Sequence, residues 1–209
     1  MEKFIVITGD VEGFTSVSTK KREVLIKQTQ ELINSWVDKK GRAMIFRGDS
    51  FQLLFENTEK ALMYAVQLRC WFKMQSPSGK KMLDARMAIG VGEVTYMGKS
   101  VLDSDGEAFH LSGRNFDAME PDEYLRIATP NEEKNEQLRV ILKLADILIS
   151  GWTTSQAEVI YKLLEGKTQQ QMADELNIVQ SAINNRIRLS KWKEIEKVIR
   201  YISKLIDKE

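Results

Sequence analysis

Two acidic residues, Asp10 and Asp49, lie where separate segments of the predicted fold come together. Asp10 follows the apolar run at residues 4–7, which predicts a buried strand, and Asp49 lies at the tip of a predicted hairpin. If these strands are neighbours, the two carboxylates converge, and at about 4 Å they repel by roughly 1–4 kcal/mol at a surface-like dielectric. A shared divalent cation removes this repulsion, and carboxylate oxygens suit Mg²⁺, Mn²⁺ or Ca²⁺. The pair predicts a metal site, with ordinary turn or capping roles as the alternative.

The residues after Asp10 form a glycine-containing turn that suits a phosphate group. Backbone N–H groups at the start of a helix bind anions. Mg²⁺ held by few carboxylates takes its remaining ligands from water and substrate phosphates. We therefore expect this turn to contact a nucleotide or polyphosphate through Val11, Gly13, Phe14 and Thr15.

The first 128 residues carry strand and helix patterns that are expected to position this site. Strands are expected at residues 4–7, 43–46, 51–55, 85–91 and 124–128, and helices at about 20–38, 61–72 and 107–119. A short strand at 94–97 is expected to pair with 85–91. This order predicts the α+β class, as a ferredoxin-like sandwich with helices on one side of an antiparallel sheet.

Beyond Pro130 the sequence predicts helices only. Residues 131–150 predict a connecting helix, and residues 153–208 predict a compact helical module. Within this module Thr168 is expected to cap one helix, Asn177 to form the turn after it, and residues 180–192 to form the next helix. The polar side of that helix predicts contacts with DNA by Gln180, Ser181, Asn184, Asn185, Arg186 and Arg188. A helical dimerisation or ligand-binding module with a solvated polar face is the alternative.

Composition limits the classes of function. The 209 residues have a formal net charge of +1, so any surface for nucleic acid must be local. Residues 180–193 supply such a surface, with four basic residues and no acidic one. Cys70 is expected to be a buried thiol, and with the single His110 it cannot form a Cys/His zinc site. The chain carries no secretory signal or membrane-length apolar run, which predicts a cytoplasmic protein.

The carboxylate motifs resemble those of a known family. Residues 9–15 (GDVEGFT) resemble the first metal motif of class III nucleotide cyclases, and residues 47–49 (RGD) resemble their second metal aspartate. Residues 86–94 (RMAIGVGEV) look like a later cyclase strand, and the resemblance covers about residues 3–128. It implies a cyclase-type sandwich with Mg²⁺ or Mn²⁺ bound at Asp10 and Asp49.

Residues 103–114 resemble the cyclase segment that reads the base and stabilises the transition state. The resemblance implies that Asp103 reads the base, that His110 stands where the family has an asparagine, and that Arg114 is the catalytic arginine. The sequence departs from the family at His110 and at Ile45, where cyclases that make cyclic AMP have a lysine. His110 and Arg114 as ordinary surface residues are the alternative. In the family the two halves of the site come from different subunits, which implies a homodimer.

Nearly the whole chain is similar to the bacterial SatD-like proteins, through residues 48–52 (GDSFQ) and 105–109 (DGEAF). Residues 168–187 resemble the helix-turn-helix modules of bacterial regulators. We expect a cyclase-like domain at 1–129, a connecting helix at 130–150 and a DNA-binding helix-turn-helix domain at 151–209. Two functions follow: a DNA-binding regulator that binds a nucleotide with a metal, or an active purine nucleotide cyclase or related enzyme controlled by its C-terminal part. A scaffold with vestigial sites is a third alternative.

Overall fold

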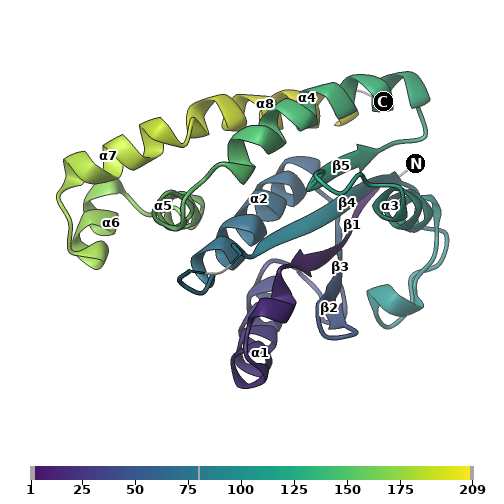
Figure 1. Ribbon diagram of the computed structural model, residues 1–209. Helices are drawn as coiled ribbons and strands as arrows, with labels where there is room; N and C mark the ends of the chain where they lie inside the picture. The colour runs from purple at the N-terminus through teal and green to yellow at the C-terminus, as the bar shows by residue number, and fades with distance from the viewer. Residues whose placement is uncertain (1–2, 80, 208–209) are drawn as a thin grey trace.

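A five-stranded sheet lies at the centre of the protein (Figure 1). The computed structural model describes residues 3–79 and 81–207, and its strands are β1 (Phe4–Glu12), β2 (Ala43–Phe46), β3 (Ser50–Phe55), β4 (Asp84–Gly92) and β5 (Leu125–Ala128). The strand order is β2-β3-β1-β4-β5. Neighbouring strands are antiparallel except β4 and β5, which are parallel. The α+β class is confirmed, whereas the expectation of a purely antiparallel sheet is wrong at β5.

Helices cover both faces of this sheet. Because side chains alternate along a strand, β1 sends Ile5 and Ile7 into the core cluster that contains α1 (Thr19–Ser35) and α2 (Thr58–Met74). Val6 points the other way and packs with Phe109 of α3 (Glu107–Asp117). Figure 1 shows α2 and α3 on opposite sides of the sheet. The expectation that helices lie on one side only is therefore wrong.

Strand β1 is longer than its apolar run predicts, and it continues through Gly9 to Glu12. A Cβ atom at Gly9 would lie 2.5 Å from the carbonyl oxygen of Arg86 and 2.6 Å from the ring of Phe51, so glycine permits close packing here rather than ending the strand. The predicted strand at 94–97 does not pair with β4. Its Tyr96 forms an isolated bridge with Asp105 instead.

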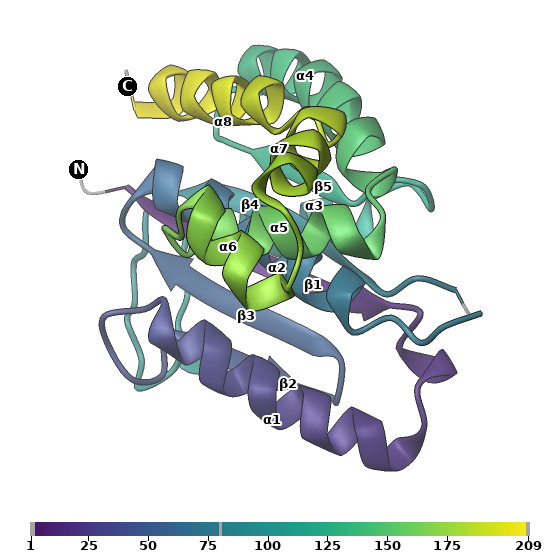
Figure 2. The same ribbon diagram turned by 90° about the vertical axis from the view of Figure 1, so that its left-hand side faces the viewer.

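The C-terminal helices are α4 (Glu132–Ser150), α5 (Thr154–Leu164), α6 (Gln169–Leu176), α7 (Gln180–Leu189) and α8 (Trp192–Asp207). Helix α7 ends three residues earlier than predicted, because Lys191 adopts a left-handed backbone conformation with φ 56°. Helices α4 and α8 lie side by side in both views (Figure 2). In the described part of the chain, no helix is long and apolar enough to cross a bilayer.

The hydrophobic core does not stop at residue 130. One cluster of buried side chains includes Ile7 of β1, Leu68 of α2, Ile160 of α5 and Ile199 of α8. Helix α2 contacts both α5 and α8, so the C-terminal helices pack directly on the sheet-bearing part. The division into domains stays a prediction.

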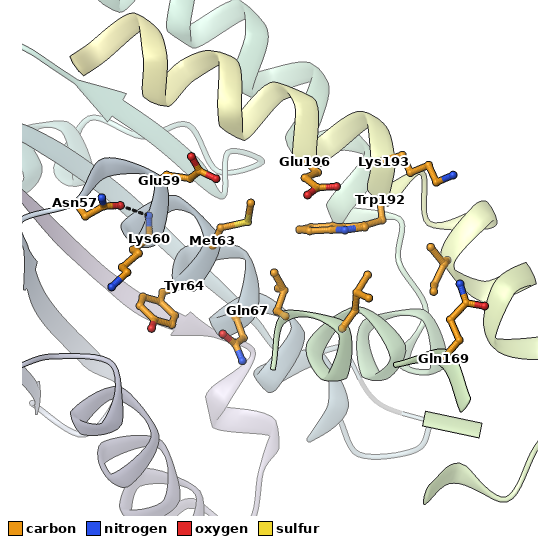
Figure 3. A pocket seen from close by; sticks show the side chains of 13 residues that line it. Asn57, Glu59, Lys60, Met63, Tyr64, Gln67, Gln169, Trp192, Lys193 and Glu196 are labelled. Carbon is orange, nitrogen blue, oxygen red and sulfur yellow. Dashed lines mark hydrogen bonds between the residues drawn. The ribbon is translucent and has the colours of Figure 1, made fainter. Parts of the chain in front are cut away.

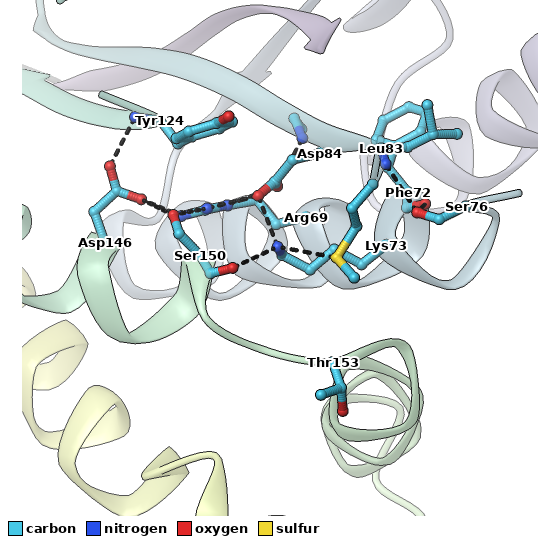
Figure 4. A network of polar contacts seen from close by, with 12 residues as sticks. Arg69, Phe72, Lys73, Ser76, Leu83, Asp84, Tyr124, Asp146, Ser150 and Thr153 are labelled. Carbon is cyan, nitrogen blue, oxygen red and sulfur yellow. Dashed lines mark hydrogen bonds and ion pairs between the residues drawn. The ribbon is translucent and has the colours of Figure 1, made fainter. Parts of the chain in front are cut away.

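A buried ionic network also joins the two parts (Figure 4). Arg69 of α2 is 0% exposed and donates bidentate hydrogen bonds of 2.8 and 2.7 Å to Asp84 of β4. It also forms an ion pair with Asp146 of α4, whose other carboxylate oxygen accepts from the backbone N–H of Tyr124 at 2.7 Å. Next to Arg69 lies Cys70, which is buried, and burial raises the pKa of its thiol. This thiol is a packed side chain rather than a reactive group.

Candidate functional site

Asp10 lies in β1 with one carboxylate oxygen left without a partner. The residue faces Arg86 across the β1–β4 pair. Its Oδ1 atom is buried and accepts no hydrogen bond from any described residue. Burial raises the pKa of Asp10, the positive charge of Arg86 lowers it, and the charges of Asp49 and Glu12 raise it further. A buried carboxylate oxygen without a donor is costly, and a bound cation would relieve that cost.

The hairpin turn brings Asp49 to the same region. Arg47 and Gly48 both adopt left-handed conformations, with φ 52° and 89°, and this reverses the chain between β2 and β3. Asp49 and Gly48 line a small cavity together with Val11 and Phe14. The carboxylate of Asp49 is near enough to act on the pKa of Asp10. The structure thus brings both predicted metal ligands and part of the predicted phosphate turn together.

The turn at residues 13–15 is built on a glycine. Gly13 has φ 78°, which favours glycine, and it leads into a short 3₁₀ helix, η1 (Phe14–Ser16). Phe14 is buried, and Arg22 of α1 lies over its ring at 6.0 Å. Arg22 also donates to the carbonyl oxygens of Thr15 at 3.2 Å and Val17 at 2.7 Å. Arg22 therefore holds the turn that carries the predicted phosphate contacts.

The chemistry of this region fits one weakly chelated cation. In the described residues no group of three or more Asp, Glu, His or Cys side chains converges on a metal position. Two carboxylates are nevertheless sufficient for Mg²⁺, which keeps several water or phosphate ligands. The unpartnered Oδ1 of Asp10 is the feature that fits such an ion.

Three charged residues near Asp10 were not singled out from the sequence: Glu12, Lys81 and Arg86. Glu12 lies two residues after Asp10 in the same strand and so points to the same face, where it pairs with Lys81. Arg86 donates to the carbonyl oxygen of Met119 at 2.8 Å and lies 5.6 Å from the ring of Phe116. Had β1 been predicted to continue past Gly9, the two-residue spacing would have revealed Glu12.

The predicted base-reading residues lie elsewhere in the chain. Asp103 ends the short helix η2 (Val101–Asp103) and accepts from Ser100 at 2.9 Å. The backbone N–H of Val101 donates to Gly41, which precedes β2, whereas Asp49 follows β2. Asp103 and Asp49 thus lie at opposite ends of that strand. A single chain does not unite the two predicted halves of the nucleotide site.

His110 and Arg114 are both exposed on α3, one helical turn apart. The Nε2 atom of His110 lies 2.8 Å from a carboxylate oxygen of Asp105, which satisfies the imidazole locally. The guanidinium of Arg114 has no hydrogen bond or ion pair within residues 3–79 and 81–207. Arg114 is therefore available to a ligand or to another subunit.

Helix α7 presents the predicted DNA-contacting residues to solvent. Ile183 and Ile187 are 0% and 8% exposed and fix its inner side. The amide side chain of Asn185 accepts from Arg188 at 2.9 Å. On the outer side all the predicted contact residues are exposed except Arg186, which is half-buried; the exposed ones are Gln180, Ser181, Asn184, Asn185 and Arg188.

The preceding helix fixes the placement of α7. Thr168 and Gln171 form a reciprocal capping box at the start of α6. Asn177 ends α6 in a left-handed conformation, with φ 51° and ψ 46°. Ala173 of α6 is buried, and α6 contacts α7 directly. A three-residue turn therefore sets the angle between the two helices.

This chain is a mixed α+β protein with a central sheet and a helical C-terminal part. The sequence profile of the SatD family matches residues 4–201, and the chain belongs to this family. No curated protein matches it significantly. Among solved structures, it is similar to the active GGEEF domain of a diguanylate cyclase from Vibrio cholerae, at 14% identity and a TM-score of 0.43, covering 62% of this chain and 84% of that chain.

Proposed function

We propose that this SatD-family protein is a cytoplasmic DNA-binding regulator in which α6, the turn at 177–179 and α7 form a helix-turn-helix. The observation that carries the proposal is the outer side of α7. Exposed amide and basic side chains lie there, on the side of the helix opposite the buried Ile183 and Ile187. Asn and Gln side chains form paired hydrogen bonds with adenine, and Arg with guanine or phosphate. This combination suits a helix lying in the major groove of DNA.

Local charge supports the same proposal. Between residues 180 and 193 the four basic residues, Arg186, Arg188, Lys191 and Lys193, are accompanied by no acidic residue. Phosphate contacts by such residues release counterions and provide most of the affinity for any DNA sequence. The near-neutral net charge of the whole chain therefore does not weigh against DNA binding.

The sheet-bearing part is proposed to bind a nucleotide or polyphosphate together with Mg²⁺ or Mn²⁺. The unpartnered Oδ1 of Asp10, within electrostatic reach of Asp49, supports a cation at this position. The adjacent turn would supply phosphate contacts through Val11, Gly13, Phe14 and Thr15. The chemistry that a cation would supply there is neutralisation of phosphate charge. Asp10 and Asp49 would hold it, and Arg22 fixes the turn.

We further propose that the protein works as a homodimer. Two-fold symmetry would present two copies of α7 to palindromic half-sites about one helical turn of DNA apart. It would also allow Asp103, His110 and Arg114 of one subunit to approach Asp10 and Asp49 of the other. That arrangement is what the resemblance to class III cyclases implies.

Catalysis by a nucleotide cyclase mechanism is the second candidate function. Arg114, exposed and without a partner in the described chain, is the observation that favours it, because an arginine there would offset charge developing on phosphate. Two features weigh against it. Ile45 packs into the core with Phe51, where a base-reading lysine would be needed, and His110 is already paired with Asp105.

The DNA-binding proposal is tested by mobility shift of labelled genomic fragments. We expect the wild-type protein to retard them, and added salt or the double substitution Arg186→Ala and Arg188→Ala to weaken binding about tenfold or more. The matched control is Arg139→Ala on α4, which is exposed and far from α7 in sequence, and which should bind as the wild type does. Equal binding by the double variant and the control would refute the role of α7.

The enzymatic alternative is tested with each nucleoside triphosphate and Mn²⁺. A cyclic product that disappears in Asp49→Ala and in Arg114→Ala would replace the pure-regulator account with the enzymatic one. Absence of product, together with Mn²⁺-dependent nucleotide binding that Asp49→Ala removes, would support the regulator. Absence of any nucleotide or metal binding would refute both accounts of the sheet-bearing part.

A further inference from the structure

A groove lies where the N-terminal half of α2 meets α5, α7 and the start of α8. It has a volume of about 750 Å³ and is lined by Met63 and Tyr64 of α2, Leu163 and Leu164 of α5, Ile187 of α7 and Trp192 of α8, among others. Figure 3 shows Met63 of α2 pointing toward Trp192 across this space. The volume lies within the range of small-molecule sites, which are mostly apolar with a few polar groups.

Two largely buried residues of the groove have polar side-chain groups that form no hydrogen bond with the described residues. Gln67 is 4% exposed, and its side-chain amide forms no hydrogen bond with any described residue. Trp192 is 5% exposed, and its indole N–H is likewise without a partner in that part of the chain, whereas the indole N–H of Trp152 donates to Ser190 at 2.8 Å. Both groups remain accessible to solvent, so each is able to donate a hydrogen bond to a ligand in the groove.

The charges in the groove favour an anion. Its two carboxylates, Glu59 and Glu196, are both paired with Arg200, at 3.4 and 3.0 Å. Its two lysines, Lys60 and Lys193, have no ion pair within the described residues. Figure 3 shows these lysines at opposite ends of the groove, with the apolar side chains between them. The available charge is therefore positive at both ends of an apolar channel.

We propose that this groove binds an organic anion with a flat apolar body, anchored by Lys60 and Lys193 and hydrogen-bonded by Gln67 and Trp192. The site is separate from Asp10. Phe51, which pairs with Gly9, lies near the start of β3, whereas the groove starts at Asn57, beyond the other end of that strand. Because Ile187 of α7 lines the groove, an occupant would touch the helix proposed to read DNA. The expectation that an occupant changes DNA affinity rests on the proposed function. The proposal that the groove binds a ligand does not.

The experiment is a fluorescence titration of the full chain with bis-ANS, a dianionic aromatic dye, in the absence of DNA. We expect one saturable site per chain, with affinity reduced about threefold by Lys60→Gln or Lys193→Gln and about tenfold by both, the size expected of partly exposed ion pairs. The neutral dye N-phenyl-1-naphthylamine should bind more weakly than bis-ANS. Lys197→Gln, an exposed lysine one turn beyond Lys193, is the matched control and should leave the affinity unchanged.

A second variant distinguishes the groove from an exposed apolar surface on α4. The outer side of α4 exposes Val140, Leu144 and Ile147 by 60–65%, and a dye is able to bind there instead. Leu144→Ser should leave bis-ANS binding unchanged if the groove is the site. Loss of binding in Leu144→Ser, unchanged binding in the double lysine variant, or no saturable binding would each overturn the proposal. None of these results depends on whether the protein binds DNA.

Discussion

Asp10 and Arg86 face one another across β1 and β4, yet the guanidinium of Arg86 donates its hydrogen bonds to main-chain oxygens, at 2.8 Å to Met119 and 3.3 Å to Glu120. Arg86 is therefore held by the chain segment after α3. It acts on Asp10 through charge, and it lowers the pKa of that carboxyl without satisfying its buried oxygen. One buried carboxylate oxygen of Asp10 is therefore left without a hydrogen bond and is able to bind a cation.

The first prediction concerns Asp10→Asn and pH. Burial raises the pKa of Asp10, and Asp49 and Glu12 add to this effect against Arg86. A carboxyl group with a raised folded-state pKa stabilises the fold fully below its unfolded pKa of about 3.9, and this contribution is lost as pH rises through the folded pKa. At pH 7 without divalent cations, Asp10→Asn should therefore raise the melting temperature, by roughly 2–4 °C for about 1 kcal/mol.

The control and the cation response complete this test. Asp117→Asn, on the exposed side of α3, should change the melting temperature little. Added Mg²⁺ or Mn²⁺ should stabilise the wild type and not Asp10→Asn. A wild-type protein that is more stable than Asp10→Asn at pH 7 without cations, or a cation response that survives the substitution, would contradict the account of Asp10.

A second prediction compares two glycines. At Gly9 a Cβ atom would lie 2.5 Å from the backbone oxygen of Arg86, whereas at Gly113 in α3 it would meet nothing within 4 Å. Gly9→Ala should destabilise the fold by about 1–3 kcal/mol through overpacking. Gly113→Ala should stabilise it by about 0.5–1 kcal/mol because alanine favours a helix interior. Urea denaturation measures both, and a harmless Gly9→Ala would show that the β1–β4 packing is looser than described.

A third prediction concerns the buried ionic network. Arg69→Met leaves Asp146 buried without its cation and Asp84 with Lys73 alone, at 3.0 Å, and removal of one partner from such a buried pair costs about 3–5 kcal/mol. Because Asp146 belongs to α4, unfolding should be affected in both the sheet and the C-terminal helices, as monitored by urea denaturation with circular dichroism. Arg139→Met, an exposed arginine on α4, is the control. A loss below 1 kcal/mol in Arg69→Met would show that the network does not hold the two parts together.

Parts of the fold were predictable because local patterns determine them. The hairpin strand 43–46 was predicted with its observed bounds, and the turns at Gly48 and Asn177 were predicted from residue types that tolerate left-handed conformations. The end of β1 was not predictable in this way. Gly9-Asp10 has the composition of a turn, and only the approach of Arg86 and Phe51 explains why glycine lies inside the strand.

Other features depend on contacts that a single sequence does not reveal. Both faces of β1 are apolar, through Ile5 and Val6, so periodicity could not say which face α3 covers. No glycine or proline marks the end of α7 at Leu189 in the sequence. The chain turns instead at Lys191, which adopts a left-handed conformation. The exposed side of α7 was predictable, since Ile183 and Ile187 fix the opposite side. The convergence of Asp49 with Asp10 was predicted only on the condition that their strands are neighbours, and the strand order supplies that condition.

The most direct test of the central claim, that α7 binds DNA, is the salt dependence of affinity for double-stranded DNA, measured by fluorescence anisotropy. Each phosphate contact contributes about 0.9 to the slope of log affinity against log salt. The account predicts a steep slope for the wild type, lowered by about 1–2 in the variant with Arg186→Ala and Arg188→Ala, and unchanged in Arg139→Ala. Identical slopes in all three proteins, or no measurable binding at low salt, would contradict it.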